Sequence, residues 1–245
     1  MAYRVNHTTI NEIPIIECYP EEAKSIKGVF FIVHGHTCSK ELYYFGKLPE
    51  RLTNLGFLVV SIDAYKHGSR MEEPYQSGQD YEKTMAMPEV IKKTAIDLSN
   101  LYLNHYIDFA GKLGFLGISM GGHIVYQMPK YLHKIDFLIP LIGAPDLKRH
   151  YQDMKASFLG QPRMNEISSI LVELENSDSI YEPSSKMLII EGTQDNVVTY
   201  KNAFDFYSRM HDSGYLNIHY KDFPVGHTVT EEMEQTIEDF IRENI

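Results

Sequence analysis

Short, continuously apolar runs alternate with longer segments whose apolar residues recur at helical spacing along most of the chain. The apolar runs have the length and composition of strands that are buried on both faces of a sheet. We expect strands at 28–33, 57–62, 112–118, 137–142, 187–191 and 216–223. Because strands that alternate with helices form βαβ units, the pattern predicts an α/β fold with a mostly parallel sheet and helices on both faces.

The segments between these strands predict the helices, and the N-terminus predicts a separate hairpin. Helical patterns cover 41–55, 85–106, 123–132, 200–211 and 230–241. The first pattern stops at Gly56, a residue type common at helix C-termini, and Pro129 should kink or end the third. Residues 4–19 are typical of two extended strands that turn near Asn11 and Glu12, as in an edge hairpin.

One long segment interrupts the alternation. Residues 146–183 contain two helical patterns, at 147–158 and 165–176, without a clear strand. We expect a small helical cap inserted over one end of the sheet. Because strands of one sheet flank the insertion on both sides, a single domain over 1–245 is predicted. Four large side chains of the insertion either line an acyl pocket or pack within the insertion itself, namely Tyr151, Met154, Phe158 and Met164.

Composition and charge narrow the functional classes. The chain has 245 residues, is 43% hydrophobic and carries a formal net charge of −10. These proportions are typical of a globular protein, and an acidic surface repels phosphate backbones and anionic lipid headgroups, so we expect neither nucleic-acid nor membrane partners. Cys18 and Cys38 form neither a disulfide framework nor a metal motif. The N-terminus lacks an apolar signal core, which favours the cytoplasm.

A nucleophile motif follows the strand expected at 112–118. Residues 117–122 read GISMGG, a G-x-S-x-G sequence placed between a strand and a helix. Such a turn projects the hydroxyl of Ser119, while the flanking glycines let neighbouring backbone pass closely. The backbone N–H of Met120, at the start of the helix, is then placed to stabilise a tetrahedral oxyanion.

Two later strand ends supply candidate partners for the serine. Asp195 follows one strand in a turn-rich loop, and His227 follows the last strand, just before the final helix. A nucleophilic serine needs a base and a group that orients the base. The chain order Ser119, Asp195, His227 is the one expected on this kind of sheet. Asp146, at the end of the strand expected at 137–142, is a rival for the acid.

The loop after the strand at 28–33 offers a second oxyanion donor. Gly35 permits a sharp turn that would aim the backbone N–H of His36 into the site. Only this backbone group is needed, so the role of the His36 imidazole is a separate question. We predict an oxyanion hole formed by the N–H groups of His36 and Met120.

Polar residues near the same edge leave two further roles open. Thr37, His67 and Arg70 are candidates for contact with substrate, and the alternative is a scaffold role in which Arg70 and Asp63 brace neighbouring loops. No metal is expected, because the histidines near the site show no ligand spacing such as H-E-x-x-H. These histidines are His34, His36, His67 and His123.

Together these residues resemble the α/β-hydrolase superfamily, and more narrowly small bacterial serine carboxylesterases of its prolyl-oligopeptidase-like and dienelactone-hydrolase-like branch. The resemblance extends from about residue 28 to the C-terminus. It is carried by the turn at 34–37 with 39–41, the segment 63–70, the GISMGG sequence, the loop at 192–198 and the Gly-His pair at 226–227. It implies a carboxylesterase with Ser119 as nucleophile, Asp195 as orienting acid and His227 as base. His36 departs from the family pattern, which is often apolar at this position.

The predicted activity is hydrolysis of a small, neutral carboxylic ester, with a short acyl chain, through an acyl-enzyme and without cofactor or metal. The same three residues would serve a thioesterase, a lactonase or an aminopeptidase, and the sequence does not separate these. A binding protein that keeps the fold without catalysis is the alternative from another class. A homodimer formed through the insertion is also open.

Overall fold

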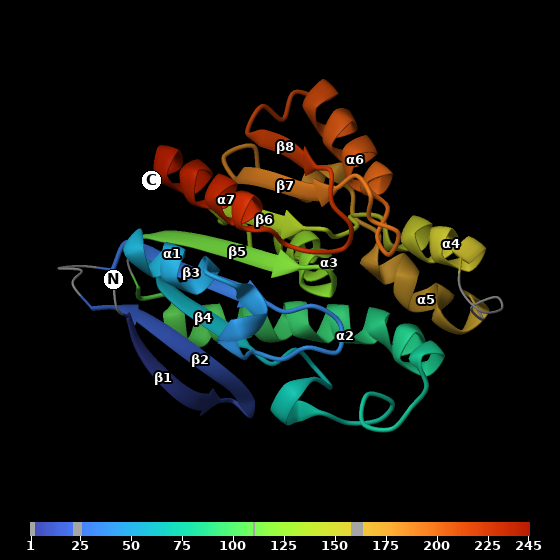
Figure 1. Ribbon diagram of the computed structural model, residues 1–245, viewed down its shortest axis with the longest axis horizontal. Coiled ribbons are helices and arrows are strands. Elements are labelled where there is room, and N and C mark those ends of the chain that lie inside the picture. Colours follow the sequence, from blue (N-terminus) through green and yellow to red (C-terminus); the bar gives the residue numbers. More distant parts are fainter. Residues whose placement is uncertain (1–2, 22–25, 110, 158–163) are drawn as a thin grey trace.

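An eight-stranded sheet runs through the molecule in the order β1-β2-β4-β3-β5-β6-β7-β8 (Figure 1). The computed structural model describes residues 3–21, 26–109, 111–157 and 164–245. Its strands are β1 (Tyr3–Ile10), β2 (Ile13–Pro20), β3 (Gly28–Val33), β4 (Leu58–Ile62), β5 (Lys112–Ile118), β6 (Phe137–Leu141), β7 (Lys186–Gly192) and β8 (Ile218–Phe223). The expected hairpin and all the strands expected after it are present.

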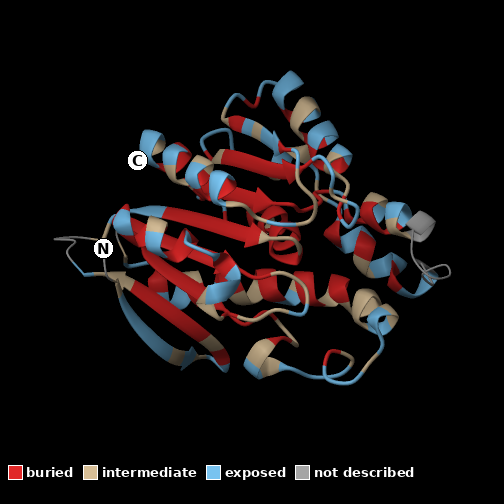
Figure 2. Cartoon of the chain, in the orientation of Figure 1, coloured by how far each residue is buried: buried red, intermediate tan, exposed pale blue. Residues whose placement is uncertain are grey.

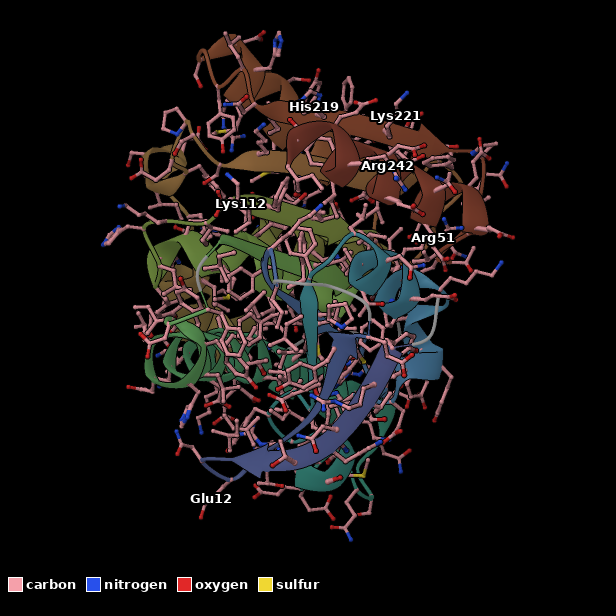
Figure 3. The ribbon with its side chains drawn as sticks, turned by 90° about the vertical axis from the view of Figure 1, so that its left-hand side faces the viewer. Glu12, Arg51, Lys112, His219, Lys221 and Arg242 are labelled. Carbon is pink, nitrogen blue, oxygen red and sulfur yellow. The ribbon has the colours of Figure 1, made fainter. Side chains whose placement is uncertain are left out.

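The sheet is mostly parallel, as predicted. β3 pairs in parallel with β4 and β5, and parallel pairing continues through β6 and β7 to β8. The hairpin turns at Asn11 and Glu12, which both have positive φ, and β2 joins the sheet antiparallel to β4. Figure 3 shows Glu12, in the hairpin, and Lys221, on β8, at opposite edges. Because β3 to β8 are parallel, their carboxyl ends lie on one side of the molecule. In parallel sheets of this kind, ligand-binding and catalytic sites lie on that side.

Helices cover both faces of the sheet, as predicted (Figure 1). One face packs against α1 (Leu48–Asn54) and α7 (Glu231–Asn244), and the other against α2 (Asp80–Leu101), α3 (Met120–Gln127) and α6 (Tyr200–Asp212). Shorter turns are η1 (Leu42–Phe45), η2 (Gly68–Arg70), η3 (Tyr102–Tyr106), η4 (Met128–Lys130) and η5 (Asp178–Ile180). In Figure 2 the buried positions fill the central strands. No helix among the described residues is long and apolar enough to cross a membrane.

The segment 41–55 forms two short helices where the sequence predicts one. Gly46, with φ 57°, separates η1 from α1, and Pro49 lies in the first turn of α1. The backbone of Gly46, with φ 57° and ψ −128°, lies in a region that favours glycine, so it is this conformation that requires glycine. Glu234 of α7 accepts the backbone N–H of Lys47, directly before α1, at 3.2 Å, so the start of α1 also involves a residue far along the chain. The local apolar pattern does not contain this contact.

α2 and α3 start earlier than their apolar patterns indicate. Gln79 and Glu82 form a capping box that begins α2 at Asp80. α3 begins directly after Ser119, and Pro129 ends it within η4, as expected. The polar first turn of α2 lies outside its apolar stripe, and the first turn of α3 contains two glycines, so a prediction based on the apolar pattern places both starts too late.

Residues 146–183 form two helices, α4 (Leu147–Ser157) and α5 (Met164–Leu174), and the described part of this segment contains no strand. Figure 1 shows both helices beside the carboxyl ends of the strands. Tyr151 is fully buried and its hydroxyl donates to the carbonyl oxygen of Thr84 at 2.6 Å, so it packs within the protein. Met154 lines a small hollow together with Asp195. Phe158 and the side chain of Met164 lie outside the described residues.

Candidate active site

Ser119 lies at the turn between β5 and α3, with φ 57° and ψ −113°. Few residues other than glycine adopt this backbone conformation, so the surrounding structure must impose it. A Cβ at Gly117 would lie 2.1 Å from the carbonyl oxygen of Gly121, and a Cβ at Gly121 would lie 2.1 Å from that of Val33. Close backbone approach therefore requires both glycines, and the tight turn holds the Ser119 hydroxyl at the start of α3.

Hydrogen bonds join the three side chains that the sequence predicts to act together. Oγ of Ser119 lies 2.9 Å from Nε2 of His227, and Nδ1 of His227 lies 2.6 Å from Oδ2 of Asp195. The three residues follow β5, β8 and β7, whose carboxyl ends share one side of the sheet. With Nδ1–H donated to Asp195, the free lone pair of Nε2 can accept the proton of Ser119.

Backbone groups hold the carboxylate of Asp195 in one orientation. Its Oδ1 accepts the N–H groups of Val197 at 2.8 Å and of Val198 at 2.9 Å, and the side chain is inaccessible to solvent. Burial alone would raise the pKa of this carboxyl. The hydrogen bonds from His227 and from the two backbone amides outweigh burial, so the pKa lies below its ordinary value of 3.8. Asp195 is therefore a carboxylate at neutral pH.

Asp146, the rival for the acid, has different contacts. Its Oδ1 accepts the N–H of Arg149 at 2.9 Å, which caps the start of α4, and its carbonyl oxygen accepts the side-chain amide of Asn202 at 2.8 Å. Among the described residues, Asp195 and not Asp146 is bonded to His227. The structure therefore pairs the histidine with the first of the two candidate acids.

The turn after β3 lies against Ser119. Its N–H at Cys38 donates to the carbonyl oxygen of Gly35 at 3.2 Å, which closes a turn centred on His36 and Thr37, and Thr37 has φ 62°. A Cβ at Gly35 would lie 3.6 Å from Cβ of Ser119. In the described part of the chain no acceptor is found for the N–H of His36. Met120 is the first residue of α3, and the first N–H groups of a helix have no intrahelical acceptor. Neither predicted oxyanion donor thus has an acceptor among the described residues that would compete with a ligand.

His34 ties this turn to the loop after β4. Its Nδ1–H donates to the carbonyl oxygen of Gly35 at 2.8 Å, and its Nε2 accepts the N–H of Ala64 at 3.1 Å. One ring nitrogen must donate and the other must accept, which only the neutral imidazole can do. Burial lowers the pKa of His34 to about 4, which keeps the ring neutral at neutral pH.

Thr37 and His67 are not among the described residues that line the cavity beside Ser119, so this cavity gives no support to the substrate contacts expected of them. Thr37 is exposed. His67 is fully buried behind His36, with 5.9 Å between the ring centroids, and its Nδ1 lies 2.9 Å from the carbonyl oxygen of Tyr65. A position after a strand predicts the correct edge of the sheet, but the turn of the loop directs His67 inward.

Arg70 also lies outside the cavity walls, and its contacts match the scaffold alternative. Its Nη1 lies 2.7 Å from Oδ2 of Asp97 and donates to the carbonyl oxygen of Asp63 at 3.2 Å. The carboxylate of Asp63 in turn accepts the backbone N–H of Lys40 at 2.8 Å and that of Ser69 at 2.8 Å. Arg70 and Asp63 therefore brace the loops after β3 and β4 against each other.

Two buried histidines, His123 and His150, lie near the catalytic candidates, and only His123 was considered from the sequence, as a metal ligand. His123 accepts the N–H of Ala144 through Nδ1 at 2.8 Å, and its ring lies 5.0 Å from that of His150 on α4. Burial, and after it the nearby His227, lowers the pKa of His150 to about 4, so its imidazole is neutral. The spacing of Leu147, His150 and Met154 on one helical face could have indicated its burial. No group of three or more His, Cys, Asp or Glu side chains in the described ranges is arranged to hold a metal ion.

Glu191, near the end of β7, is, like His150, a buried ionisable group that was not singled out from the sequence. Its Oε1 accepts the N–H of Gly143 at 3.3 Å, and its Oε2 has no hydrogen-bond partner among the described residues. Burial raises the pKa of this carboxyl well above its ordinary value of 4.5, and the charge of Asp195 adds to the shift. A charged residue type at the end of an otherwise apolar strand was the available signal.

Because of Glu191, we expect the stability of the folded protein to decrease as pH rises. Because the folded protein binds this proton more tightly than the unfolded chain, the free energy of unfolding should fall as pH rises above 4.5. Glu191→Gln keeps an acceptor for Gly143 and removes the titration. The difference in free energy of unfolding between Glu191→Gln and the wild type is measured by urea unfolding at about pH 5 and about pH 8. We expect this difference to shift in favour of the variant by about 1 kcal/mol or more at the higher pH. The exposed Glu243→Gln is the control, and an equal difference at both pH values would contradict the prediction.

A cavity of about 540 Å³ opens beside Ser119 and His227. Its walls come from the turn after β3, from η1, and from the loops that follow β7 and β8. Glu234 is the one Asp, Glu, Lys or Arg residue in the described lining, and its carboxylate accepts the backbone N–H of Lys47 at 3.2 Å. The cavity therefore offers a neutral ligand access to the serine hydroxyl.

Comparisons with known proteins find similarity in structure only. No protein-family model matches the sequence, and no curated protein matches it either. Among solved structures, TT1662 from Thermus thermophilus is similar over 99% of this chain and 98% of its own, with 20% identity and a TM-score of 0.77. Est1E from Butyrivibrio proteoclasticus, solved with ferulic acid bound, is similar over 98% of both chains, with 18% identity and a TM-score of 0.68.

A third match is to part of a longer enzyme. The acylaminoacyl peptidase of Pyrococcus horikoshii is similar over all of this chain and 42% of its own, with 15% identity and a TM-score of 0.75. At these identities the matches establish a shared fold, which is the predicted one. Activity and substrate have to be inferred from the site itself.

Proposed function

We propose that this chain, which has the α/β-hydrolase fold, is a serine hydrolase that cleaves carboxylic esters through an acyl-enzyme intermediate. The observation that supports the proposal most strongly is the continuous hydrogen-bonded series Asp195–His227–Ser119 at the wall of a cavity. A serine with this base and this orienting acid has the arrangement needed for nucleophilic attack on a carbonyl carbon.

In the proposed reaction, His227 takes the hydroxyl proton as Oγ of Ser119 attacks the ester carbonyl. Asp195 holds the imidazole in the tautomer that can accept this proton and stabilises the imidazolium that forms. The carbonyl oxygen becomes an oxyanion, which the N–H groups of His36 and Met120 stabilise. His227 then protonates the departing alcohol, and the acyl group stays on Ser119 as an ester.

The second half of the reaction uses the same groups. His227 removes a proton from water as the water oxygen attacks the acyl carbon, and the C–O bond to Ser119 breaks. The serine oxygen recovers a proton from the imidazolium and the carboxylic acid leaves. Because every proton passes through His227, the cycle needs no cofactor or metal.

A panel of substrates tests the proposal. We expect hydrolysis of p-nitrophenyl acetate and butyrate, with kcat/KM falling for the palmitate ester, since the proposed substrate has a short acyl chain. Thioester, lactone and aminoacyl p-nitroanilide substrates separate the other activities that the same residues would support. Faster turnover of one of these would contradict the ester proposal, and failure to hydrolyse any of them would favour a binding protein with this fold.

A further inference from the structure

The cavity beside Ser119 has an aromatic side. Its lining includes Tyr43, Tyr44 and Phe45 of η1, together with Val197 and Val229 from the loops after β7 and β8. A volume of about 540 Å³ lies within the range of about 300–1,000 Å³ that is usual for small-molecule sites. Aromatic and branched apolar side chains therefore line the same cavity as the proposed nucleophile.

Two of these aromatic rings have surface that no protein group covers. Tyr43 is 73% exposed and Tyr44 is 39% exposed, and their ring centroids lie 4.3 Å apart. Adjacent exposed aromatic residues in a cavity wall are a feature of binding sites, because a ring supplies a large apolar contact at little cost in side-chain entropy. A free face of either tyrosine can pack against a further planar ring.

The turn that carries the tyrosines is anchored in the protein. Phe45 is buried in the core between the sheet and α7. Next to it, Gly46 has a backbone φ of 57°, which favours glycine, and Glu234 of α7 accepts the N–H of Lys47 at 3.2 Å. A ligand would thus not have to order η1 in order to bind, which lowers the entropic cost of recognition.

The charge of the cavity favours a neutral ring over an ionic group. The described lining contains no Lys or Arg, and the carboxylate of Glu234 is already bonded to the backbone of Lys47 and lies 3.5 Å from Nε of Arg51. Burial lowers the pKa of His36 to about 4, so its imidazole adds no positive charge at neutral pH. The described wall therefore has no Lys or Arg side chain to compensate a carboxylate or a phosphate of the substrate.

We propose that Tyr43 and Tyr44 form a subsite for a neutral, planar aromatic group of the ester that Ser119 attacks. The inference rests on the proposed function and specifies its substrate class as aryl or arylalkyl esters. Stacking on the tyrosines would be the same whether the ring belongs to the acid or to the alcohol. The position of the ring within the substrate is therefore a question for experiment.

Two matched pairs of esters provide the test. Benzyl acetate and cyclohexylmethyl acetate differ only in the aromaticity of the alcohol, and ethyl 3-phenylpropanoate and ethyl 3-cyclohexylpropanoate differ only in that of the acid. We expect the wild type to prefer the aromatic member of one pair by about twofold to tenfold in kcat/KM, which corresponds to the energy of one aromatic pair. The pair that shows the preference identifies the side on which the ring lies.

Variants connect the preference to the two tyrosines. Tyr43→Leu and Tyr44→Leu keep an apolar side chain without a ring and should each reduce the aromatic-to-saturated ratio toward one, whereas Tyr43→Phe should retain it. Leu216→Ala is the control, since Leu216 is 74% exposed and precedes β8 at the opposite end of the strands. A ratio near one in the wild type for both pairs, or a ratio unchanged in the leucine variants, would overturn the subsite.

The outcome for the subsite can be separated from that for the proposed function. A protein that hydrolyses the saturated esters and is labelled by a fluorophosphonate, but shows no aromatic preference, is a serine esterase without this subsite. A protein that hydrolyses none of the four esters and is not labelled contradicts the proposed function itself.

Discussion

Ser119→Ala should lower kcat for p-nitrophenyl butyrate by about 10⁴- to 10⁶-fold while leaving the protein folded. The hydroxyl oxygen is the atom that the proposal places on the substrate carbonyl, and no other hydroxyl lies 2.9 Å from His227 in the described structure. Alanine keeps the Cβ that already fits the strained backbone at φ 57°, so the turn between β5 and α3 should survive. Steady-state kinetics with active protein of verified concentration measure the loss.

A serine on another helix provides the matched control. Ser168 is exposed on α5 and its hydroxyl donates to the carbonyl oxygen of Asn165 at 3.0 Å, without contact to the cavity. Ser168→Ala should keep kcat and KM within about twofold of the wild type. If Ser119→Ala retained wild-type activity with an unchanged melting temperature, Ser119 could not be the nucleophile.

Asp195→Asn should lower kcat by about 10⁴-fold, because the amide would select the wrong tautomer of His227. Oδ1 accepts the N–H groups of Val197 and Val198, so the oxygen of an asparagine must stay at that position. Its NH₂ group would then face Nδ1 of His227 in place of the acceptor now at 2.6 Å. The imidazole would carry its proton on Nε2 and could not accept the proton of Ser119.

Asp146→Asn is the matched control for this substitution. Asparagine is as good a helix cap as aspartate, so its side-chain oxygen should still accept the N–H of Arg149 and α4 should keep its start at Leu147. We expect kcat within about twofold of the wild type. A large loss in Asp146→Asn together with a small loss in Asp195→Asn would exchange the roles of the two acids, and the pH dependence of kcat for both variants would show which carboxylate acts on the base.

Much of the fold follows from the sequence because the central strands are buried on both faces. Such strands read as continuous apolar runs, and their ends mark where Ser119, Asp195 and His227 can meet. The GISMGG sequence was equally informative, since Gly117 and Gly121 each face a backbone carbonyl at a distance that excludes a side chain. These features depend on residues that are close together in the sequence, so a local sequence pattern is enough to predict them.

The features that sequence reasoning missed depend on contacts between distant segments. The break in 41–55 lies at Gly46, where Glu234 of α7 accepts the N–H of the next residue, Lys47, and His150 approaches His123 only because α4 is placed beside α3. His67 follows a strand, as the site residues do, yet its loop turns the ring into the core. Position at a strand end thus predicts the side of the sheet, while the direction of each side chain depends on packing.

Mass-spectrometric mapping of a fluorophosphonate adduct tests the central claim most directly, because the reagent phosphonylates a serine only when a neighbouring base activates it. The account predicts one adduct per chain on Ser119, none in Ser119→Ala, and much slower labelling in Asp195→Asn. A wild-type protein that stays unlabelled, or one that hydrolyses esters and carries the adduct on another residue, would contradict it.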